Sequence, residues 1–231
     1  MGTFQEHISL SAVIPTLEAG ETVAGLVGAL AASSLVGEVL VADGGSRDES
    51  AALAAAAGAR VIEAPRGRGT QLARGAAAAR GEWLLFLHAD CRPEAGWEEA
   101  VERFLAMPGA AATAGYFTLV LDDPGPAARR LERIVAWRCR LFALPYGDQG
   151  LLIGRRLYDA VGGYRPLPLM EDVDLARRLG RRHLAPIGAR IIASARRYRA
   201  GGYWRRPARN LFCLGLYFLG LPPARIARLY E

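Results

Sequence analysis

Charged side chains that could do chemistry follow the ends of short apolar segments in the first half of the chain. These side chains are Glu18, Asp43, Arg68 and Asp90. A carboxylate can accept hydrogen bonds from a nucleobase or from ribose hydroxyls, an Arg can pair with a phosphate, and an Asp can hold a divalent cation that bridges a diphosphate. Each group also has a structural alternative, since Glu18 can complement a helix dipole and Asp43, ahead of two glycines, can shape a turn.

A second acidic group lies at residues 171–174, in the sequence Glu-Asp-Val-Asp. The apolar positions that follow, Leu175, Ala176 and Leu179, have helical spacing and predict a helix that begins at Glu171. Acidic residues are common at such a position because they complement the helix dipole. A carboxylate within hydrogen-bond reach of a hydroxyl can also take its proton as a general base.

The elements that must position these groups follow from the apolar pattern. Residues 83–87 are five consecutive apolar residues between Gly81 and Pro93, which is typical of a strand buried on both faces. Similar short segments alternate with segments of helical periodicity and predict a mostly parallel sheet flanked by helices. Ligands of such sheets bind beyond the carboxyl ends of the strands. We expect strands over residues 8–14, 38–42, 60–63, 83–88, 112–121 and 189–194, and helices beginning near residues 22, 49, 70, 97, 127, 155 and 171.

Composition limits the classes of protein to consider. The 231 residues are 52% hydrophobic, which suits a globular core and excludes a largely disordered chain. The formal charge is +6, and all 29 basic residues are Arg. Anionic ligands or a membrane surface are therefore expected partners, with genome composition as the alternative cause. The first half has no Arg tract with interleaved aromatic residues, which argues against a nucleic-acid module.

The cysteines and the chain ends bear on the compartment. Cys91, Cys139 and Cys213 are widely spaced and form no C-x-x-C pair, which fits a reducing compartment and gives neither a disulfide framework nor a zinc site. The sequence shows no secretory signal and no apolar run of about 18 residues. We expect a cytoplasmic protein, with association to the inner face of the membrane as a further possibility to test.

Four short motifs follow one another along the chain: Val13–Glu18, Val41–Asp48, Arg68-Gly69 and Leu87–Asp90. In order and spacing they resemble family-2 glycosyltransferases of the GT-A fold. The resemblance implies an α/β fold of GT-A type, with a Rossmann-like, mostly parallel sheet flanked by helices and a C-terminal helical tail. The G-x-G-x-x-G and G-x-x-x-x-G-K-[ST] patterns are absent, which argues against dinucleotide and P-loop binding.

The resemblance also implies an activity, namely transfer of a sugar from a UDP- or GDP-linked donor to an acceptor hydroxyl with inversion at the anomeric carbon. Asp172 would be the general base, and Glu171 could share that role. Asp90 would contact Mn²⁺ or Mg²⁺ together with His88, which stands where the family usually has the first Asp of D-x-D. The donor-binding residues implied are Pro15, Thr16, Glu18, Asp43, Arg68, His88, Ala89, Asp90, Asp148, Gln149 and Arg197.

Alternatives stay open for some residues and for the function. Asp148 and Gln149 could simply form a turn, and Arg197 could belong to a solvated basic loop. A nucleotidyltransferase would share the sheet and the metal carboxylates, although its basic, Gly-rich first loop is absent near residues 15–20. An inactive module that binds sugar nucleotides or a membrane is suggested by His88 and by the apolar tail.

We expect one domain over residues 1–231. Its nucleotide-binding half would cover residues 1–110, its acceptor and catalytic half residues 111–200, and its hydrophobic helical tail residues 201–231. The apolar stretch 204–221 is too short to span a bilayer. It could dock on the domain, pair two subunits or lie in a membrane interface, and a lipid-linked acceptor would suit such a tail. Nucleic acid is not an expected partner.

Overall fold

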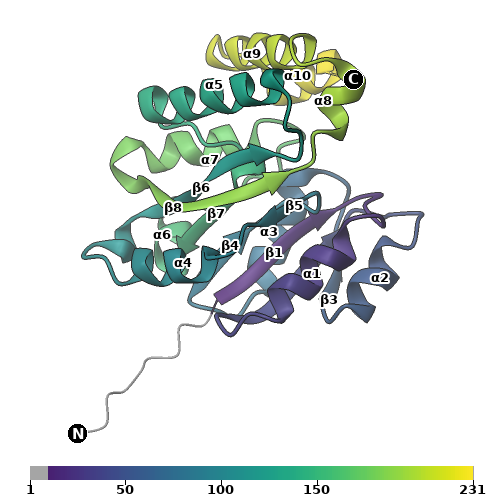
Figure 1. Cartoon of the computed structure of the whole chain (residues 1–231), viewed down its shortest axis with the longest axis vertical. Coiled ribbons are helices and arrows are strands. Elements are labelled where there is room, and N and C mark those ends of the chain that lie inside the picture. Colours follow the sequence, from purple (N-terminus) through teal and green to yellow (C-terminus); the bar gives the residue numbers. More distant parts are fainter. Residues whose placement is uncertain (1–9, 231) are drawn as a thin grey trace, which may run out of the picture.

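The computed structural model describes residues 10–230, and within them the chain forms one twisted sheet with helices on both faces (Figure 1). Its eight described strands have the order β3-β2-β1-β4-β7-β6-β8-β5. Strands β1–β4 pair in parallel, whereas β7 is antiparallel to both β4 and β6. The strands are β1 (Leu10–Thr16), β2 (Val36–Asp43), β3 (Arg60–Glu63), β4 (Trp83–Phe86), β5 (Cys91–Pro93), β6 (Ala114–Leu121), β7 (Leu151–Gly154) and β8 (Leu184–Ala193). The mostly parallel α/β fold predicted from the sequence is confirmed.

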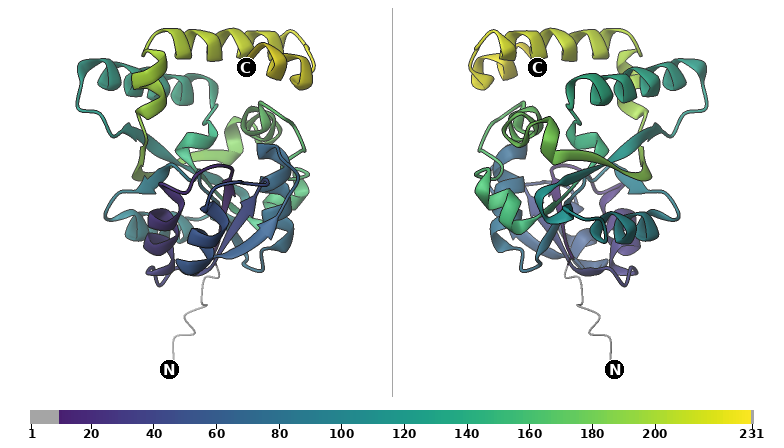
Figure 2. Two further views of the ribbon diagram at one scale, coloured as in Figure 1. Left: turned by 90° about the vertical axis from the view of Figure 1, so that its right-hand side faces the viewer. Right: turned by 90° about the vertical axis from the view of Figure 1, so that its left-hand side faces the viewer.

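The helices divide into two layers and a cap. Helices α1, α2, α4 and α5 bury their apolar faces in the core on one side of the sheet, and α3, α6 and α7 bury theirs on the other. Helices α9 and α10 pack over α7 at one end of the molecule (Figure 2). The helices are α1 (Val23–Ala31), α2 (Ser50–Ala56), α3 (Arg68–Ala78), α4 (Trp97–Leu105), α5 (Pro126–Phe142), α6 (Arg155–Ala160), α7 (Glu171–Leu179), α8 (Arg196–Gly201), α9 (Arg205–Phe218) and α10 (Pro223–Tyr230).

The carboxyl ends of β1, β2 and β4 meet at one edge of the sheet. Every residue of β1 is buried, as a strand covered on both faces by helices requires. Thr16, at the end of β1, lies opposite Asp43, at the end of β2. The chain runs from β1 to β2 and β3 on one side and then crosses to β4 on the other side of β1. Such a reversal of strand order is where open α/β sheets form a ligand crevice.

Several boundaries differ from the sequence predictions. Strand β4 ends at Phe86, so Leu87 and His88 lie beyond it, and Leu87 closes the strand by donating its N–H to the Val13 carbonyl oxygen. The predicted strand 189–194 begins earlier, at Leu184, because its first half pairs with β6 through a register shift. Strand β5 was not predicted, since three residues give no periodicity. Residues 8 and 9 of the first predicted strand lie outside the described residues.

The C-terminal tail and the three cysteines have defined positions in the structure. No helix among residues 10–230 is long and apolar enough to cross a membrane. Cys91, Cys139 and Cys213 are free thiols, all buried. The apolar segment 204–221 forms α9, which packs Cys213 and Leu214 against α7 and so docks on the rest of the chain.

Candidate active site

The first loop at the sheet edge is held by Asp43. Its Oδ2 accepts hydrogen bonds from the backbone N–H groups of Gly45 and Ser46, each at 3.0 Å, and its Oδ1 accepts one from the Ser46 hydroxyl at 2.5 Å. The Glu18 carboxylate, on a residue with φ of +51°, accepts the backbone N–H of Arg47 at 2.9 Å. Both carboxylates thus shape the loop 43–48, which is the structural alternative that the sequence left open for Asp43.

Gln71 of α3 joins the ends of β1 and β2. Its side-chain amide donates to the carbonyl oxygens of Thr16, at 2.7 Å, and Ala42, at 2.9 Å. Sequence reasoning missed this residue, because a Gln inside a helix gives no signal of contacts to strands 55 and 29 positions away. The Thr16 hydroxyl beside it is buried without a hydrogen-bond partner, so a polar group is left over at the crevice.

His88 and two arginines meet after β4. The Nε2 of His88 is buried without a hydrogen-bond partner. Burial, together with the positive charges of Arg68 and Arg197, lowers the pKa of His88 to about 3. The imidazole is therefore neutral at physiological pH and keeps a lone pair that can bind a metal or accept a hydrogen bond. Arg197, on α8, is exposed yet close enough to act on His88.

Asp148 lies close to the carboxylates of Asp90 and Asp172. Its Oδ1 is buried without a partner. Burial raises the pKa of Asp148, the guanidinium of Arg138 opposes that rise, and the negative charges of Asp172 and Asp90 add to it. The carboxylates of Asp90 and Asp172 thus lie close enough to repel that of Asp148, and such a cluster favours binding of a cation or a proton.

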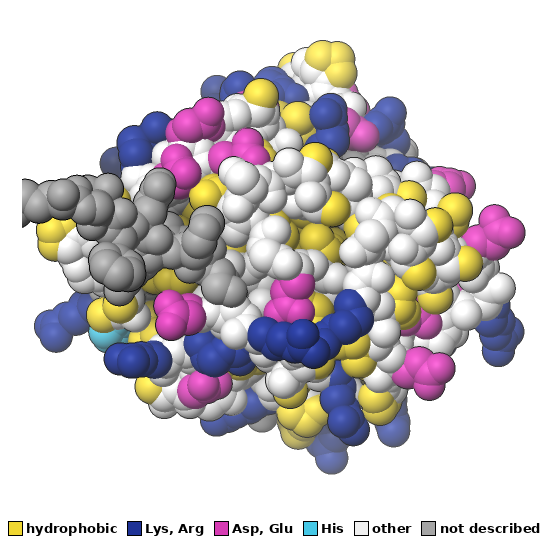
Figure 3. Space-filling view, turned by 90° about the horizontal axis from the view of Figure 1, so that it is seen from below, with side chains coloured by type: hydrophobic (Ala, Val, Ile, Leu, Met, Phe, Trp, Pro, Cys, Tyr) yellow, Lys and Arg dark blue, Asp and Glu magenta, His cyan; other side chains and the backbone are white. Residues whose placement is uncertain are grey.

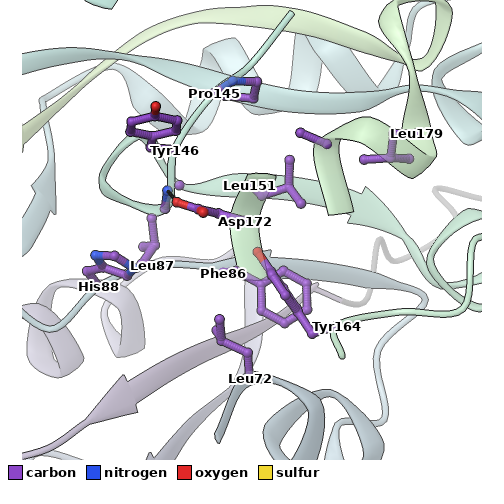
Figure 4. Close-up of a pocket in the computed structure, with 13 residues that line it drawn as sticks. Leu72, Phe86, Leu87, His88, Pro145, Tyr146, Leu151, Tyr164, Asp172 and Leu179 are labelled. Atoms are coloured by element: carbon purple, nitrogen blue, oxygen red, sulfur yellow. Dashed lines mark hydrogen bonds between the residues drawn. The ribbon is translucent and has the colours of Figure 1, made fainter. Parts of the chain in front are cut away.

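Asp172 is held in place by the loop after Tyr146 (Figure 4). Its Oδ2 accepts the Gly147 N–H at 2.8 Å, and its Oδ1 accepts the N–H of Val173 at 2.7 Å. The residue borders a small cavity of about 20 Å³, which is room for about one water molecule or hydroxyl group. Met170, two residues before Asp172 and directly before α7, has φ of +65°, and such strain at the start of a helix commonly marks a functional position.

Glu171 is buried and does not line this cavity. It is 1% exposed, and its nearest opposite charge is the Arg68 guanidinium, 3.5 Å away. Burial raises the pKa of Glu171 to about 7, with the neighbouring Asp172 charge adding to the rise and Arg68 opposing it. The arrangement makes Asp172 the carboxylate at the cavity and Glu171 a buried partner of Arg68.

Gln149 holds the loop 144–149 from inside. It is 2% exposed, its side-chain oxygen accepts from Arg138 at 2.9 Å, and its amide donates to the Phe117 carbonyl oxygen at 3.1 Å. The Arg138 guanidinium lies 3.4 Å from the centre of the Tyr146 ring. These contacts favour the turn-forming alternative for Gln149 over contact with a sugar.

A divalent cation fits these residues only if a bound substrate and water supply further oxygen donors. Among residues 10–230, no three His, Cys, Asp or Glu side chains come together as a ready metal site. The unpartnered Nε2 of His88 and Oδ1 of Asp148 are available donors, and Asp90 is near enough to Asp148 to influence its pKa. Mg²⁺ and Mn²⁺ commonly bind through one or two carboxylates together with substrate phosphates and water, which is what these residues offer.

Comparisons with known proteins show the family of the chain. The family model described as "Glycosyl transferase family 2" matches residues 11–167. Glucosyl-3-phosphoglycerate synthase of Mycolicibacterium paratuberculosis is 32% identical over 93 residues, which cover 36% of this chain and 28% of that protein. The family match removes the nucleotidyltransferase alternative.

Solved structures share the fold. Mannosyl-3-phosphoglycerate synthase from Rubrobacter xylanophilus aligns with a TM-score of 0.56 and 21% identity, over 81% of this chain and 65% of that one. Glucosyl-3-phosphoglycerate synthase from Mycobacterium tuberculosis, solved with Mn²⁺, UDP and glucosyl-3-phosphoglycerate, aligns with a TM-score of 0.55 and 22% identity, over 80% and 70%. This chain therefore spans under a third of its curated relative and about two thirds of the similar structures.

Proposed function

The chain belongs to glycosyl transferase family 2, and from that premise we propose that it transfers a sugar from a nucleoside diphosphate sugar to an acceptor hydroxyl, with inversion at the anomeric carbon. The observation that carries the proposal is the Asp172 carboxylate, fixed by the Gly147 N–H at the edge of a cavity beside the loops that follow β1, β2 and β4. A UDP-linked donor is the first choice, because a similar solved structure holds UDP, and a GDP-linked donor is the second.

In the reaction, the acceptor oxygen forms a bond to the anomeric carbon while the bond from that carbon to the diphosphate oxygen breaks. The acceptor proton passes to Asp172, and the bonding electron pair leaves with the diphosphate. Arg68 lies 3.5 Å from Glu171 and close enough to His88 to lower its pKa, and its positive charge can stabilise the negative charge that develops on the leaving group. Loops 16–18 and 43–48 would receive the nucleoside.

Asp90 and His88 would hold Mn²⁺ or Mg²⁺ together with the donor diphosphate. The bound ion would supply neutralisation of the diphosphate charge. In this chain the ligand at the first D-x-D position is a neutral imidazole and not a carboxylate, so the protein carries less negative charge toward the ion. Affinity for the metal then depends strongly on the nucleotide.

A thermal-shift screen tests donor binding directly. The full chain is heated with UDP-, GDP- and dTDP-sugars, each with and without Mn²⁺, and we expect stabilisation by one base series and only with the metal. The donor that binds is then incubated with an acceptor panel that includes 3-phosphoglycerate and alkyl glucosides. Release of the nucleoside diphosphate and the anomeric configuration of the product complete the test. Failure of every sugar nucleotide to bind contradicts the proposal.

A further inference from the structure

A large apolar groove lies between α5 and α9, next to the proposed catalytic loop. Its volume is about 670 Å³, within the range of sites that hold small molecules. The walls include Ile134, Trp137 and Leu141 from α5 and Leu211 and Phe218 from α9.

Most of the large hydrophobic side chains that are exposed within residues 10–230 line this groove. Among the large hydrophobic side chains that are exposed within the described residues, every one except Met107 belongs to α5 or to residues 204–229. On the face seen from below, away from α9, apolar side chains are scattered among Arg and acidic ones (Figure 3). A local concentration of this kind marks a binding surface more often than chance exposure does.

The inner end of the groove is polar and continuous with the catalytic loop. Tyr146 lines both the groove and the small cavity beside Asp172. Asp148 and Arg138 also line the groove, and the buried Oδ1 of Asp148 has no hydrogen-bond partner. The groove thus runs from charged groups near the proposed general base, Asp172, to tryptophan and leucine side chains near solvent. An amphiphile, with a polar head and an apolar chain, has the matching distribution of polarity.

We propose that the groove between α5 and α9 binds the apolar chain of the acceptor, an amphiphile whose hydroxyl-bearing head reaches Asp172. This inference rests on the proposed function, because it places the acceptor of that same transfer. The head loses its proton to Asp172 and gains the sugar, while the alkyl or isoprenyl chain stays in the groove throughout. The apolar tail of the sequence then acts as one wall of the acceptor site.

The first test is direct binding of n-alkyl β-D-glucosides, below their micelle concentrations, to the full chain without a donor. Trp137 and Trp204 line the groove, so their fluorescence reports occupancy. We expect saturable binding that tightens about fourfold for each added methylene group until the groove is filled, with no binding of methyl β-D-glucoside. Absence of saturable binding, or affinity independent of chain length, overturns the proposal.

Two neighbouring residues on α9 give a matched pair of variants. Leu211 and Phe212 are 68% and 61% exposed, yet only Leu211 lines the groove. Leu211→Glu should weaken octyl glucoside binding at least tenfold, as should Ala208→Phe, which narrows the groove, whereas Phe212→Glu should leave binding unchanged. Equal loss in both Glu variants would point to a membrane surface and overturn the proposal, as would a dimer, seen by sedimentation, that Leu211→Glu dissociates.

Donor binding, measured by calorimetry on the same variants, separates this inference from the proposed function. Normal binding of the sugar nucleotide without binding of alkyl glucosides overturns the groove assignment alone. Saturable, chain-length-dependent binding of alkyl glucosides, without binding of any sugar nucleotide, supports the groove as an amphiphile site but overturns the proposed transfer and, with it, the acceptor role.

Discussion

Replacement of Gly147 by Ala should damage both the fold and the site through one contact. An added Cβ would lie 2.5 Å from Nε2 and 2.8 Å from Cε1 of His88. Since carbon atoms in contact prefer about 3.5 to 4 Å, the ring and the loop must separate by about 1 Å. Overpacking of this kind costs about 1 to 3 kcal/mol, which lowers the Tm of a chain of this size by about 2 to 12 °C.

The same displacement should slow turnover. The Gly147 N–H fixes the Asp172 carboxylate at 2.8 Å, and a misplacement of about 1 Å in a catalytic group can cost about 100-fold in rate. Calorimetric Tm and steady-state kcat measure the two effects. Gly28→Ala on α1 is the control, because an added Cβ there meets nothing within 4 Å.

A double-mutant cycle with His88→Ala identifies the cause. Removing the ring makes room for the new Cβ, so Gly147→Ala should cost much less stability in the His88→Ala background than in the native one. An equal Tm loss in both backgrounds, or no loss in either, would refute the reasoning about this contact.

Three further predictions concern charge. The pKa of Glu171 is raised from 4.5 to about 7 in the folded protein, so its contribution to stability is full below about pH 4.5 and is lost as pH rises through 7. Glu171→Gln should remove this loss, which amounts to about 3 kcal/mol in the free energy of unfolding between pH 4.5 and pH 8, measured with urea. Unfolding free energies that change with pH in the same way for the native chain and the variant would contradict the prediction. Arg178 donates to the buried Asp174 carboxylate at 2.6 and 2.9 Å, so Arg178→Met should lower the free energy of unfolding by about 3 to 5 kcal/mol, and an unchanged denaturation midpoint would show that Asp174 does not need this partner. EDTA should abolish stabilisation by UDP but leave the Tm of the nucleotide-free chain unchanged, since no three-ligand metal site is formed among residues 10–230; a fall in the latter Tm would reveal a structural ion.

The sheet edge was predictable from sequence because parallel strands bring their carboxyl ends together. Asp43 ends β2 and Asp90 follows β4, and because both strands run parallel to β1, their carboxyl ends lie at the same edge of the sheet. The sequence could not predict which side-chain atoms stay free of hydrogen bonds within the protein and so remain available to a ligand. Both carboxylate oxygens of Asp43 accept hydrogen bonds from its own turn, and this arrangement depends on loop geometry and not on residue type.

The features that the sequence did not predict are mainly contacts between segments far apart in the chain. Glu171 looks like any acidic residue at the start of a helix, but α7 packs so that its buried carboxylate lies 3.5 Å from the partly exposed guanidinium of Arg68 on α3. The predicted strand 189–194 omits the first half of β8, which contains Pro186 and Gly188, two residue types that weaken a strand pattern. In the structure, pairing with β6 continues on both sides of a register shift in this segment. The groove beside α5 depends on where α9 docks, which no local pattern encodes.

The most direct test of the account is the turnover of Asp172→Asn with the donor and acceptor found in the screen. Asn keeps the shape of the side chain but cannot take a proton at neutral pH. We expect kcat to fall about 100- to 10,000-fold while the donor dissociation constant, measured by calorimetry, stays at its native value. Undiminished turnover with normal donor binding would contradict the assignment of Asp172 as the general base.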